Sequence, residues 1–290
     1  MIRLLTAAVA VAFALTGAAD TADEVIARVL ENAAKIRAAD PQAVPMAFWD
    51  FDGTIIKGDV SEGLEENGEV RFRGLVQRTI EEGFNAVYDP KTGWAQYRDH
   101  DYPRLCGLGY WLGWPFNAQM FGGRETAPMD AFCRREFALV YRKWYFAFSD
   151  RVWRALEKGG VENYVVSASP ESFVRNAAES LGVGRERIRG IRVAEFGGRF
   201  TTKIIYPLPF EEGKIENVRE IVGARPHGVA IAAFGNSYRN DAPFMRYVAT
   251  QTSLPGGAKG TAVMINGGKP RAGYAEFFIK TDEADVVGDQ

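Results

Sequence analysis

Hydrophobic and polar positions along the chain predict helices and strands in alternation. Apolar residues recur at helical spacing over residues 22–39, and Asp40-Pro41 ends that pattern. Apolar runs of strand length come later in the chain, at 44–49, 164–166, 188–193, 229–234 and 262–265. Helical patterns separate most of these runs, at 150–157, 170–181 and 211–222. The alternation predicts an α/β fold with a doubly wound, Rossmann-like parallel sheet, which binds ligands beyond the carboxyl ends of its strands.

A long middle segment follows neither pattern. From about Lys57 to Ser149 the sequence mixes aromatic, charged and glycine-rich stretches and shows no strand alternation. We interpret residues 58–149 as an irregular, mainly helical cap inserted into a core that comprises residues 20–57 and 150–290. The acidic stretch 281–290 is expected to be a frayed tail.

The first residues have the pattern of a secretory signal. Met1-Ile2-Arg3 precedes a mostly apolar run from Leu4 to Leu15, and small residues follow up to Ala19. A membrane anchor is the alternative, but this run is shorter than the ~20 apolar residues that cross a bilayer. We therefore expect residues 1–19 to be removed on export to the periplasm or the medium, which leaves a protein without a membrane partner.

The charge and the cysteine content of the chain argue against nucleic-acid binding, zinc binding and thiol redox chemistry. The formal charge of −2 at pH 7 provides no basic excess for binding nucleic acid. The two cysteines, Cys106 and Cys133, have two interpretations, either a disulfide formed in an oxidising compartment or two buried free thiols. Neither belongs to a C-x-x-C or lies among histidines, so zinc binding and thiol redox chemistry have no support.

The stretch Asp50-Phe51-Asp52-Gly53-Thr54 places two carboxylates at the end of the first predicted strand. Side chains alternate along a strand, so Asp50 and Asp52 start on the same side. Gly53 allows the chain to turn away sharply behind them. One carboxylate can then act as a nucleophile while the other transfers protons, which is an arrangement suited to phosphoryl transfer.

Three more polar residues occur near the ends of predicted elements. Ser167 follows a strand and offers a hydroxyl group, with a helix N-terminus behind it, to a phosphate oxygen. Lys214 can neutralise charge on a transferring phosphoryl group. Asp241 can complete an oxygen-rich magnesium site with Asp50. Taken singly, these residues read as a capping serine, a solvated lysine and a helix cap.

Taken together and in this order, these residues resemble the four motifs of the haloacid dehalogenase superfamily. The stretches 165–171 and 213–216, which contain Ser167 and Lys214, are similar to the branch that includes phosphoserine phosphatase. The predicted insertion lies between the first and second motifs, where that branch has a helical cap of the C1 type. The resemblance covers nearly all of the chain after the predicted signal.

The resemblance implies magnesium-dependent hydrolysis of a phosphate monoester in two steps. Asp50 would attack phosphorus and form an aspartyl-phosphate. Asp52 would protonate the leaving oxygen and later take a proton from the attacking water. Ser167 and Lys214 would hold phosphate oxygens. The magnesium ligands would be the carboxylates of Asp50 and Asp241 and the backbone carbonyl of Asp52.

One position departs from the family's pattern. Where the family usually has Gly-Asp, this chain has Gly235-Asn236. An amide oxygen can still ligate magnesium, directly or through water, but it lacks the negative charge. We therefore take Asp241 as the first ligand and Asn236 as the second candidate, and we interpret Asp59 as a turn residue.

The expected substrate is a small phosphomonoester, and the sequence leaves its leaving group open. Eight aromatic residues of the cap are expected to form its inner core, or alternatively a wall for the leaving group, such as a quaternary ammonium held by cation-π contacts. They are Trp94, Tyr97, Tyr102, Tyr110, Trp111, Trp114, Phe116 and Phe121. Arg98 and His100 are interpreted as solvated residues or, alternatively, as contacts to a polar leaving group.

Two other functions and one property of the assembly also stay open. A phosphotransferase would use the same intermediate on Asp50 and pass phosphate to an acceptor other than water. A member of the fold that binds a phosphorylated ligand without turnover is the non-enzymatic alternative, and Asn236 is the feature that favours it. The oligomeric state has no signal in the sequence.

Overall fold

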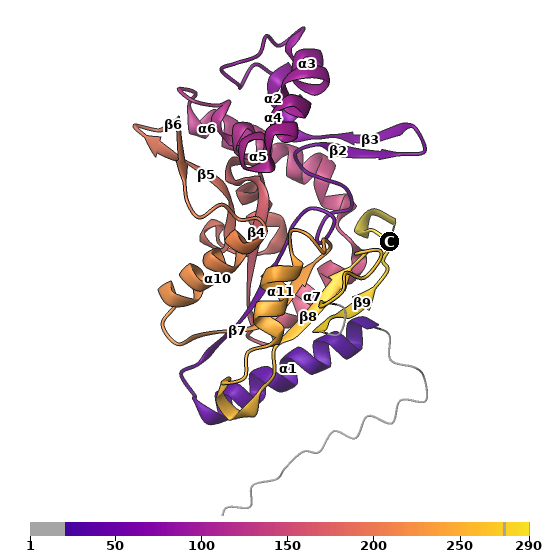
Figure 1. Cartoon of the computed structure of the whole chain (residues 1–290), viewed down its shortest axis with the longest axis vertical. Coiled ribbons are helices and arrows are strands. Elements are labelled where there is room, and N and C mark those ends of the chain that lie inside the picture. Colours follow the sequence, from indigo (N-terminus) through magenta and orange to yellow (C-terminus); the bar gives the residue numbers. More distant parts are fainter. Residues whose placement is uncertain (1–20, 275–276, 290) are drawn as a thin grey trace, which may run out of the picture.

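The computed structural model describes residues 21–274 and 277–289. The predicted signal, residues 1–19, lies outside them. Seven strands form the main sheet, in the order β6-β5-β4-β1-β7-β8-β9 (Figure 1). They are β1 (Val44–Trp49), β4 (Glu162–Pro170), β5 (Ile188–Phe196), β6 (Arg199–Ile205), β7 (Gly228–Gly235), β8 (Thr261–Ile265) and β9 (Ile279–Thr281).

The strand directions confirm the predicted α/β fold. Strands β5, β4, β1, β7, β8 and β9 pair in parallel, whereas β6 runs antiparallel to β5 at the edge. The apolar pattern does not predict β6, which starts after Gly197 and Gly198, two glycines with positive φ that turn the chain back. Three of the seven residues of β6 are exposed and only one is buried, so its sequence lacks a buried apolar run.

Helices cover both faces of the sheet. Those of the core are α1 (Thr21–Ala39), α7 (Ala147–Lys158), α8 (Glu171–Val174), α9 (Ala178–Leu181), α10 (Glu212–Ala224) and α11 (Ala242–Ala249). Ala47 and Trp49 of β1 belong to the apolar cluster that includes α1 and α7, and Met46 and Phe48 belong to the cluster that includes α10 and α11. Because both faces of β1 are buried, its sequence is apolar without a break.

The helix predicted over residues 170–181 is interrupted. Helices α8 and α9 flank a 3-10 turn at Arg175–Ala177. The other predicted helices of the core agree with α1, α7 and α10 to within a few residues.

The inserted segment lies above the carboxyl ends of the strands in Figure 1. It is mainly helical, but it also contains an antiparallel hairpin that the sequence pattern does not predict. The hairpin is weakly patterned because only Phe72 of its second strand is buried. The elements are β2 (Gly63–Glu66), β3 (Glu69–Arg73), α2 (Leu75–Glu81), α3 (Gly93–Gln96), α4 (Tyr102–Leu108), α5 (Tyr110–Gln119) and α6 (Thr126–Glu136).

The prediction of a frayed C-terminal tail is wrong for the described residues. Strand β9 extends to Thr281 in the sheet. Val286 is buried and bridges to Phe146, and the backbone N–H of Val287 donates to the carbonyl of Tyr145 at 2.8 Å. The end of the chain therefore covers the start of α7.

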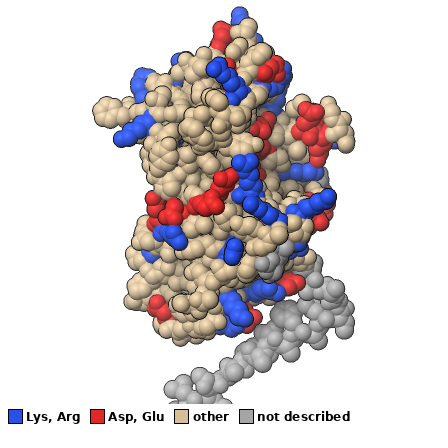
Figure 2. Space-filling view, viewed as in Figure 1, with Lys and Arg blue, Asp and Glu red and all other residues tan. Residues whose placement is uncertain are grey.

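The surface carries charges of both signs. On the face drawn in Figure 2, lysine and arginine side chains alternate with aspartate and glutamate side chains. Among the described helices, none has both the length and the apolar character needed to cross a bilayer.

Candidate active site

The loop after β1 carries the two aspartates into a cavity of about 620 Å³ between the sheet and the cap. Gly53 turns the chain with a φ of 70°, and its N–H donates to the carbonyls of Ile56 and Gly58, each at 2.9 Å. A β-carbon at this position would lie 2.0 Å from the side-chain nitrogen of Asn236. Gly53 therefore allows both the turn and the close approach of a second loop.

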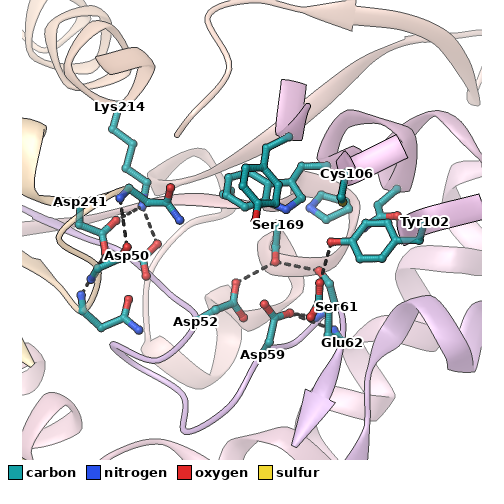
Figure 3. A pocket seen from close by; sticks show the side chains of 18 of the residues that line it. Asp50, Asp52, Asp59, Ser61, Glu62, Tyr102, Cys106, Ser169, Lys214 and Asp241 are labelled. Carbon is teal, nitrogen blue, oxygen red and sulfur yellow. Dashed lines mark hydrogen bonds and ion pairs between the residues drawn. The ribbon is translucent and has the colours of Figure 1, made fainter. Parts of the chain in front are cut away.

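The structure brings most of the residues singled out in the sequence to this cavity (Figure 3). Core residues that line it are Asp50, Asp52, Ala168, Ser169, Pro170, Lys214, Asn236, Ser237, Asn240 and Asp241. Residues from the inserted segment that line it are Asp59, Ser61, Glu62, Tyr102, Pro103, Cys106, Tyr110, Trp114 and Asn117. Ser167 is fully buried next to the cavity, and its neighbours Ala168 and Ser169 form the wall.

Lys214 lies between two carboxylates. Its Nζ donates to Oδ1 of Asp50 and to Oδ1 of Asp241, both at 2.6 Å. Burial opposes the charge on this amine, but the carboxylates of Asp241 and Asp50 outweigh burial and raise the pKa of Lys214. The ammonium group is therefore retained in the interior of the protein.

Asp50 is buried and shares its surroundings with another carboxylate. Burial, followed by the charge of Asp241, raises the pKa of Asp50 to about 7, although Lys214 opposes the shift. The second oxygen of Asp50 accepts a hydrogen bond from Thr54 at 3.1 Å. A carboxylate that titrates near neutrality can exist as an ionised nucleophile at pH 7 and above.

Asp52 is held by two different parts of the chain. Its Oδ1 accepts from the backbone N–H of Val60 at 2.6 Å, and its Oδ2 accepts from the hydroxyl of Ser169 at 2.7 Å and from that of Ser167 at 3.3 Å. Burial raises the pKa of Asp52 in spite of these donors. A raised pKa favours a carboxyl group that can hold a proton and release it.

The loop after β7 supplies oxygen atoms opposite Asp50. One oxygen of Asp241 faces Lys214, and the other accepts from the backbone N–H groups of Asn236 and Ser237 at 3.0 and 2.9 Å. Within the described residues, no three His, Cys, Asp or Glu side chains group in a way that could hold a metal ion. Oδ2 of Asp52 faces Ser167 and Ser169, and the ammonium group of Lys214 lies between the carboxylates of Asp50 and Asp241.

The donor atoms nevertheless have the chemistry that magnesium requires. The carboxylates of Asp50 and Asp241 and the amide oxygen of Asn236 are hard oxygen ligands, and magnesium commonly takes one or two carboxylates and completes its shell with water. Histidine and cysteine side chains do not line the cavity, except for Cys106 on the cap side. The site therefore fits a hard divalent cation better than a soft one.

Asp59 has the turn role that the sequence suggests. Its Oδ1 accepts from the backbone N–H groups of Ser61 and Glu62 at 2.6 and 2.9 Å. Burial and the nearby charges of Asp52 and Glu62 raise the pKa of Asp59 well above its usual value.

The aromatic cluster of the cap divides between the two interpretations. Tyr97 and Phe121 are buried, as expected of a cap core, and Trp111 is exposed. Tyr102, Tyr110 and Trp114 line the cavity instead. The rings of Tyr110 and Trp114 stack at 4.6 Å, and the hydroxyl of Tyr102 donates to Glu62 at 2.6 Å. Arg98 and His100 are exposed and, within the described residues, are not part of this wall.

The two cysteines are free thiols. Cys133 is fully buried in the cap, and Cys106 lines the cavity. Burial raises the pKa of both thiols, which keeps them protonated at neutral pH.

Sequence reasoning misses Ser61 and Ser169. Their hydroxyl oxygens lie 2.7 Å apart, and Ser169 reaches Asp52. The sequence contains one usable signal, because Ser169 follows Ser167 by two residues at the end of a predicted strand and therefore starts on the same side. Ser61 has no such signal, since it lies in a loop.

Comparison with known proteins connects this site to a family. A family model described as haloacid dehalogenase-like hydrolase matches residues 47–246, a range that contains Asp50, Lys214 and Asp241. A search of curated proteins gave no match.

Several solved structures share the fold. A protein of unknown function from Bordetella pertussis Tohama I is 18% identical, with a TM-score of 0.60, over 81% of this chain and 94% of that chain. A conserved, functionally unknown protein from Anaerococcus prevotii DSM 20548 is 15% identical, with a TM-score of 0.56, over 84% of each chain. Cytosolic 5′-nucleotidase IIIB bound to cytidine is 13% identical, with a TM-score of 0.50, over 84% of this chain and 77% of that chain.

Proposed function

The chain belongs to the haloacid dehalogenase-like hydrolase family, and we propose that it is a phosphatase that hydrolyses small phosphomonoesters through an aspartyl-phosphate on Asp50. The observation that carries this proposal is the convergence of Asp50, Asp52 and Lys214 on one cavity between core and cap. Nucleophile, proton donor and cation are the three groups that phosphoryl transfer from an ester requires.

In the first step, a carboxylate oxygen of Asp50 forms a bond to phosphorus while the bond from phosphorus to the ester oxygen breaks. Asp52 gives its proton to the leaving alcohol. In the second step, water attacks the phosphorus of the aspartyl-phosphate and gives a proton to Asp52, which releases inorganic phosphate and restores Asp50. The raised pKa of Asp52 suits both transfers.

Lys214 and the residues around it handle charge in this scheme. Lys214 is shared by Asp50 and Asp241 and lines the cavity, so its ammonium group is available to phosphate oxygens. Ser167, beneath the wall, is the second proposed contact to phosphate. Magnesium would be held by the carboxylates of Asp50 and Asp241, the carbonyl of Asp52 and, as the second candidate, Asn236. Its positive charge would neutralise the phosphate oxygens.

The first test is hydrolysis of p-nitrophenyl phosphate with and without magnesium, by the wild type and by Asp50→Asn. We expect metal-dependent turnover that Asp50→Asn abolishes. Asp59→Asn is a matched control, because Asp59 lines the same cavity but serves a turn. Acid quenching of the wild type should trap phosphate on Asp50. Turnover by Asp50→Asn at the wild-type rate would refute the assignment of Asp50 as the nucleophile.

The same assay separates the two alternatives. A phosphotransferase would form a new phosphate ester when alcohols are added, whereas a hydrolase would release only inorganic phosphate. A protein that binds without turnover would release no phosphate from p-nitrophenyl phosphate or from a panel of natural phosphomonoesters.

We also propose that the protein is exported. The support is the sequence of residues 1–19, with its basic start, apolar run and small residues before Asp20. Mass spectrometry of the protein purified from the periplasm or medium should give a first residue of Ala19 or Asp20. Recovery of the chain with Met1 from the cytoplasm would contradict export.

A further inference from the structure

Two buried serines, one from the core and one from the inserted segment, meet beside Asp52 (Figure 3). Ser169 lies at the end of β4, and Ser61 lies in the loop that leads from the core to the hairpin of the cap. Their hydroxyl oxygens are 2.7 Å apart, and the hydroxyl of Ser169 is 2.7 Å from Oδ2 of Asp52. Each serine is 5% exposed, so bulk water has little access to either hydroxyl.

The direction of these hydrogen bonds follows from the protons available. An ionised carboxylate can only accept, so Ser169 must donate to Asp52. The single proton of Ser169 is then used, and Ser61 must donate to Ser169. The two hydroxyls therefore form a chain of donors that ends on Oδ2 of Asp52.

The other oxygen of Asp52 is held from the cap side. Oδ1 accepts from the backbone N–H of Val60 at 2.6 Å. The carbonyls of Val60 and Ser61 in turn accept from the N–H groups of Leu75 and Val76, at the start of α2, at 2.7 and 3.1 Å. One carboxylate oxygen is thus held by a strand of the core and the other by a segment bound to a helix of the cap.

From this arrangement we infer that Ser169 and Ser61 are positioning residues that orient the carboxyl group of Asp52 for proton transfer. The inference rests on the proposed function, in which Asp52 protonates the leaving oxygen. Neither serine needs to touch the substrate for this purpose. A carboxyl group free to rotate would spend part of its time facing away from the leaving oxygen, and general acid catalysis would weaken.

The test uses two substrates that depend differently on a general acid. The leaving group of p-nitrophenyl phosphate departs without much help from a proton, whereas an alkoxide from an alkyl phosphate such as glycerol 2-phosphate needs protonation. We expect Ser169→Ala to lower the rate of the first step, measured as release of the alcohol in a single turnover, roughly 10- to 100-fold for the alkyl ester and several times less for the aryl ester, with KM little changed. Ser61→Ala should show the same selectivity with a smaller loss.

Two further variants separate positioning from a structural role. Ser169→Thr keeps the hydroxyl and should restore most of the alkyl phosphate activity. Ser180→Ala is the matched control, because it removes a serine hydroxyl that bonds to Tyr145 away from the cavity, and it should leave both substrates unaffected. If Ser169→Ala fails to fold, Ser61→Ala and Ser169→Thr carry the same comparison.

Equal losses of this first-step rate on both esters, or no loss on either, would overturn the positioning role while leaving the phosphatase intact. A wild type that hydrolyses neither these two esters nor any member of the panel of natural phosphomonoesters would refute the proposed function and this inference with it. Selective loss on the alkyl ester, with recovery in Ser169→Thr, would support both.

Discussion

The ammonium group of Lys214 donates a hydrogen bond of 2.6 Å to Oδ1 of Asp50, although 164 residues separate them in the chain. Both side chains are buried, so the pair is shielded from solvent. A buried carboxylate without a cation is costly, and removal of one partner of a buried pair destabilises by about 3–5 kcal/mol. The nucleophile proposed for this enzyme therefore depends on a residue of α10.

Lys214→Met removes the cation and keeps a long side chain. We expect kcat to fall about 100-fold or more, because charge on the phosphoryl group is no longer neutralised. Urea denaturation at pH 8 should show a free energy of unfolding lower by about 3–5 kcal/mol. The deficit should shrink at pH 5, where the unpaired carboxylates can take up protons. Lys203→Met, at an exposed position of β6, is the control. If Lys214→Met is as stable as the wild type at pH 8, Lys214 does not stabilise the buried carboxylates.

The pH dependence of the metal-free protein tests the environment of Asp50. Burial and the charge of Asp241 raise its pKa from 3.8 to about 7. A carboxyl whose pKa is raised by folding stabilises the protein at pH values below its unfolded pKa, and this contribution is lost as the pH rises through the folded pKa. The slope is at most about 1.4 kcal/mol per pH unit.

The measurement is the free energy of unfolding of the wild type minus that of Asp50→Asn, between pH 4 and pH 8 with a chelator present. We expect this difference to fall steadily over that range and to level off above pH 7. A difference that stays constant would show that Asp50 titrates normally. With magnesium added, kcat/KM should rise with pH on the acid side, since the nucleophile must be ionised.

Gly53→Ala tests the contact between the two loops. The φ of 70° strains any residue with a β-carbon, and that carbon would collide with Asn236 at 2.0 Å. Gly68→Ala is matched, because Gly68 has a φ of 78° but open space around it. We expect Gly68→Ala to cost about 1 kcal/mol and Gly53→Ala clearly more, together with a loss of activity. If thermal denaturation shows the same loss of stability for Gly53→Ala and Gly68→Ala, Asn236 moves away and the collision is relieved.

The free thiols give a chemical prediction. Denatured but unreduced protein should react with Ellman's reagent at both Cys106 and Cys133, because neither forms a disulfide. In the native protein only Cys106 should react, and slowly, since it lines the cavity while Cys133 is buried. Modified Cys106 should obstruct the cavity and inhibit hydrolysis. Cys106→Ser is the control for the inhibition. If the denatured, unreduced protein has no reactive thiol, Cys106 and Cys133 form a disulfide.

Val286→Asp tests the docked C-terminus. Val286 is 4% exposed, so a charge placed there would be buried without a partner. We expect a loss of about 2 kcal/mol or more in the free energy of unfolding. Val70→Asp is the same substitution at a valine that is 59% exposed, and it should cost little. Equal effects would mean that the tail does not contribute to the fold.

Features encoded by residues that are close together in the sequence could be predicted, whereas features that depend on contacts between distant segments could not. The parallel sheet, the position of Asp50 directly after β1 and that of Asp241 in the segment after β7 follow from apolar runs that are each local in sequence. Parallel strands bring their carboxyl ends to one edge, so residues that follow them converge whatever the intervening loops do. The resemblance to the haloacid dehalogenase superfamily rests on the same residues, and the family match confirms it.

Strands with few buried side chains could not be predicted in this way. The hairpin of the cap and the edge strand β6 have few buried side chains, so their sequences lack the period of a half-buried strand. The acidic tail reads as disordered because two valines, Val286 and Val287, are its main apolar content, and their docking depends on a surface formed by residues 145–147.

By itself, then, the sequence determined the fold class, because strand burial and strand ends are encoded locally, and it predicted the insertion and the carboxylates of the site. Only the tertiary structure decided which hydroxyls surround Asp52. Ser61 and Ser169 are 108 residues apart and come from different layers of the molecule. Their meeting depends on how the loop before the cap packs against β4, and the direction of a side chain in a loop is set by such packing rather than by local sequence.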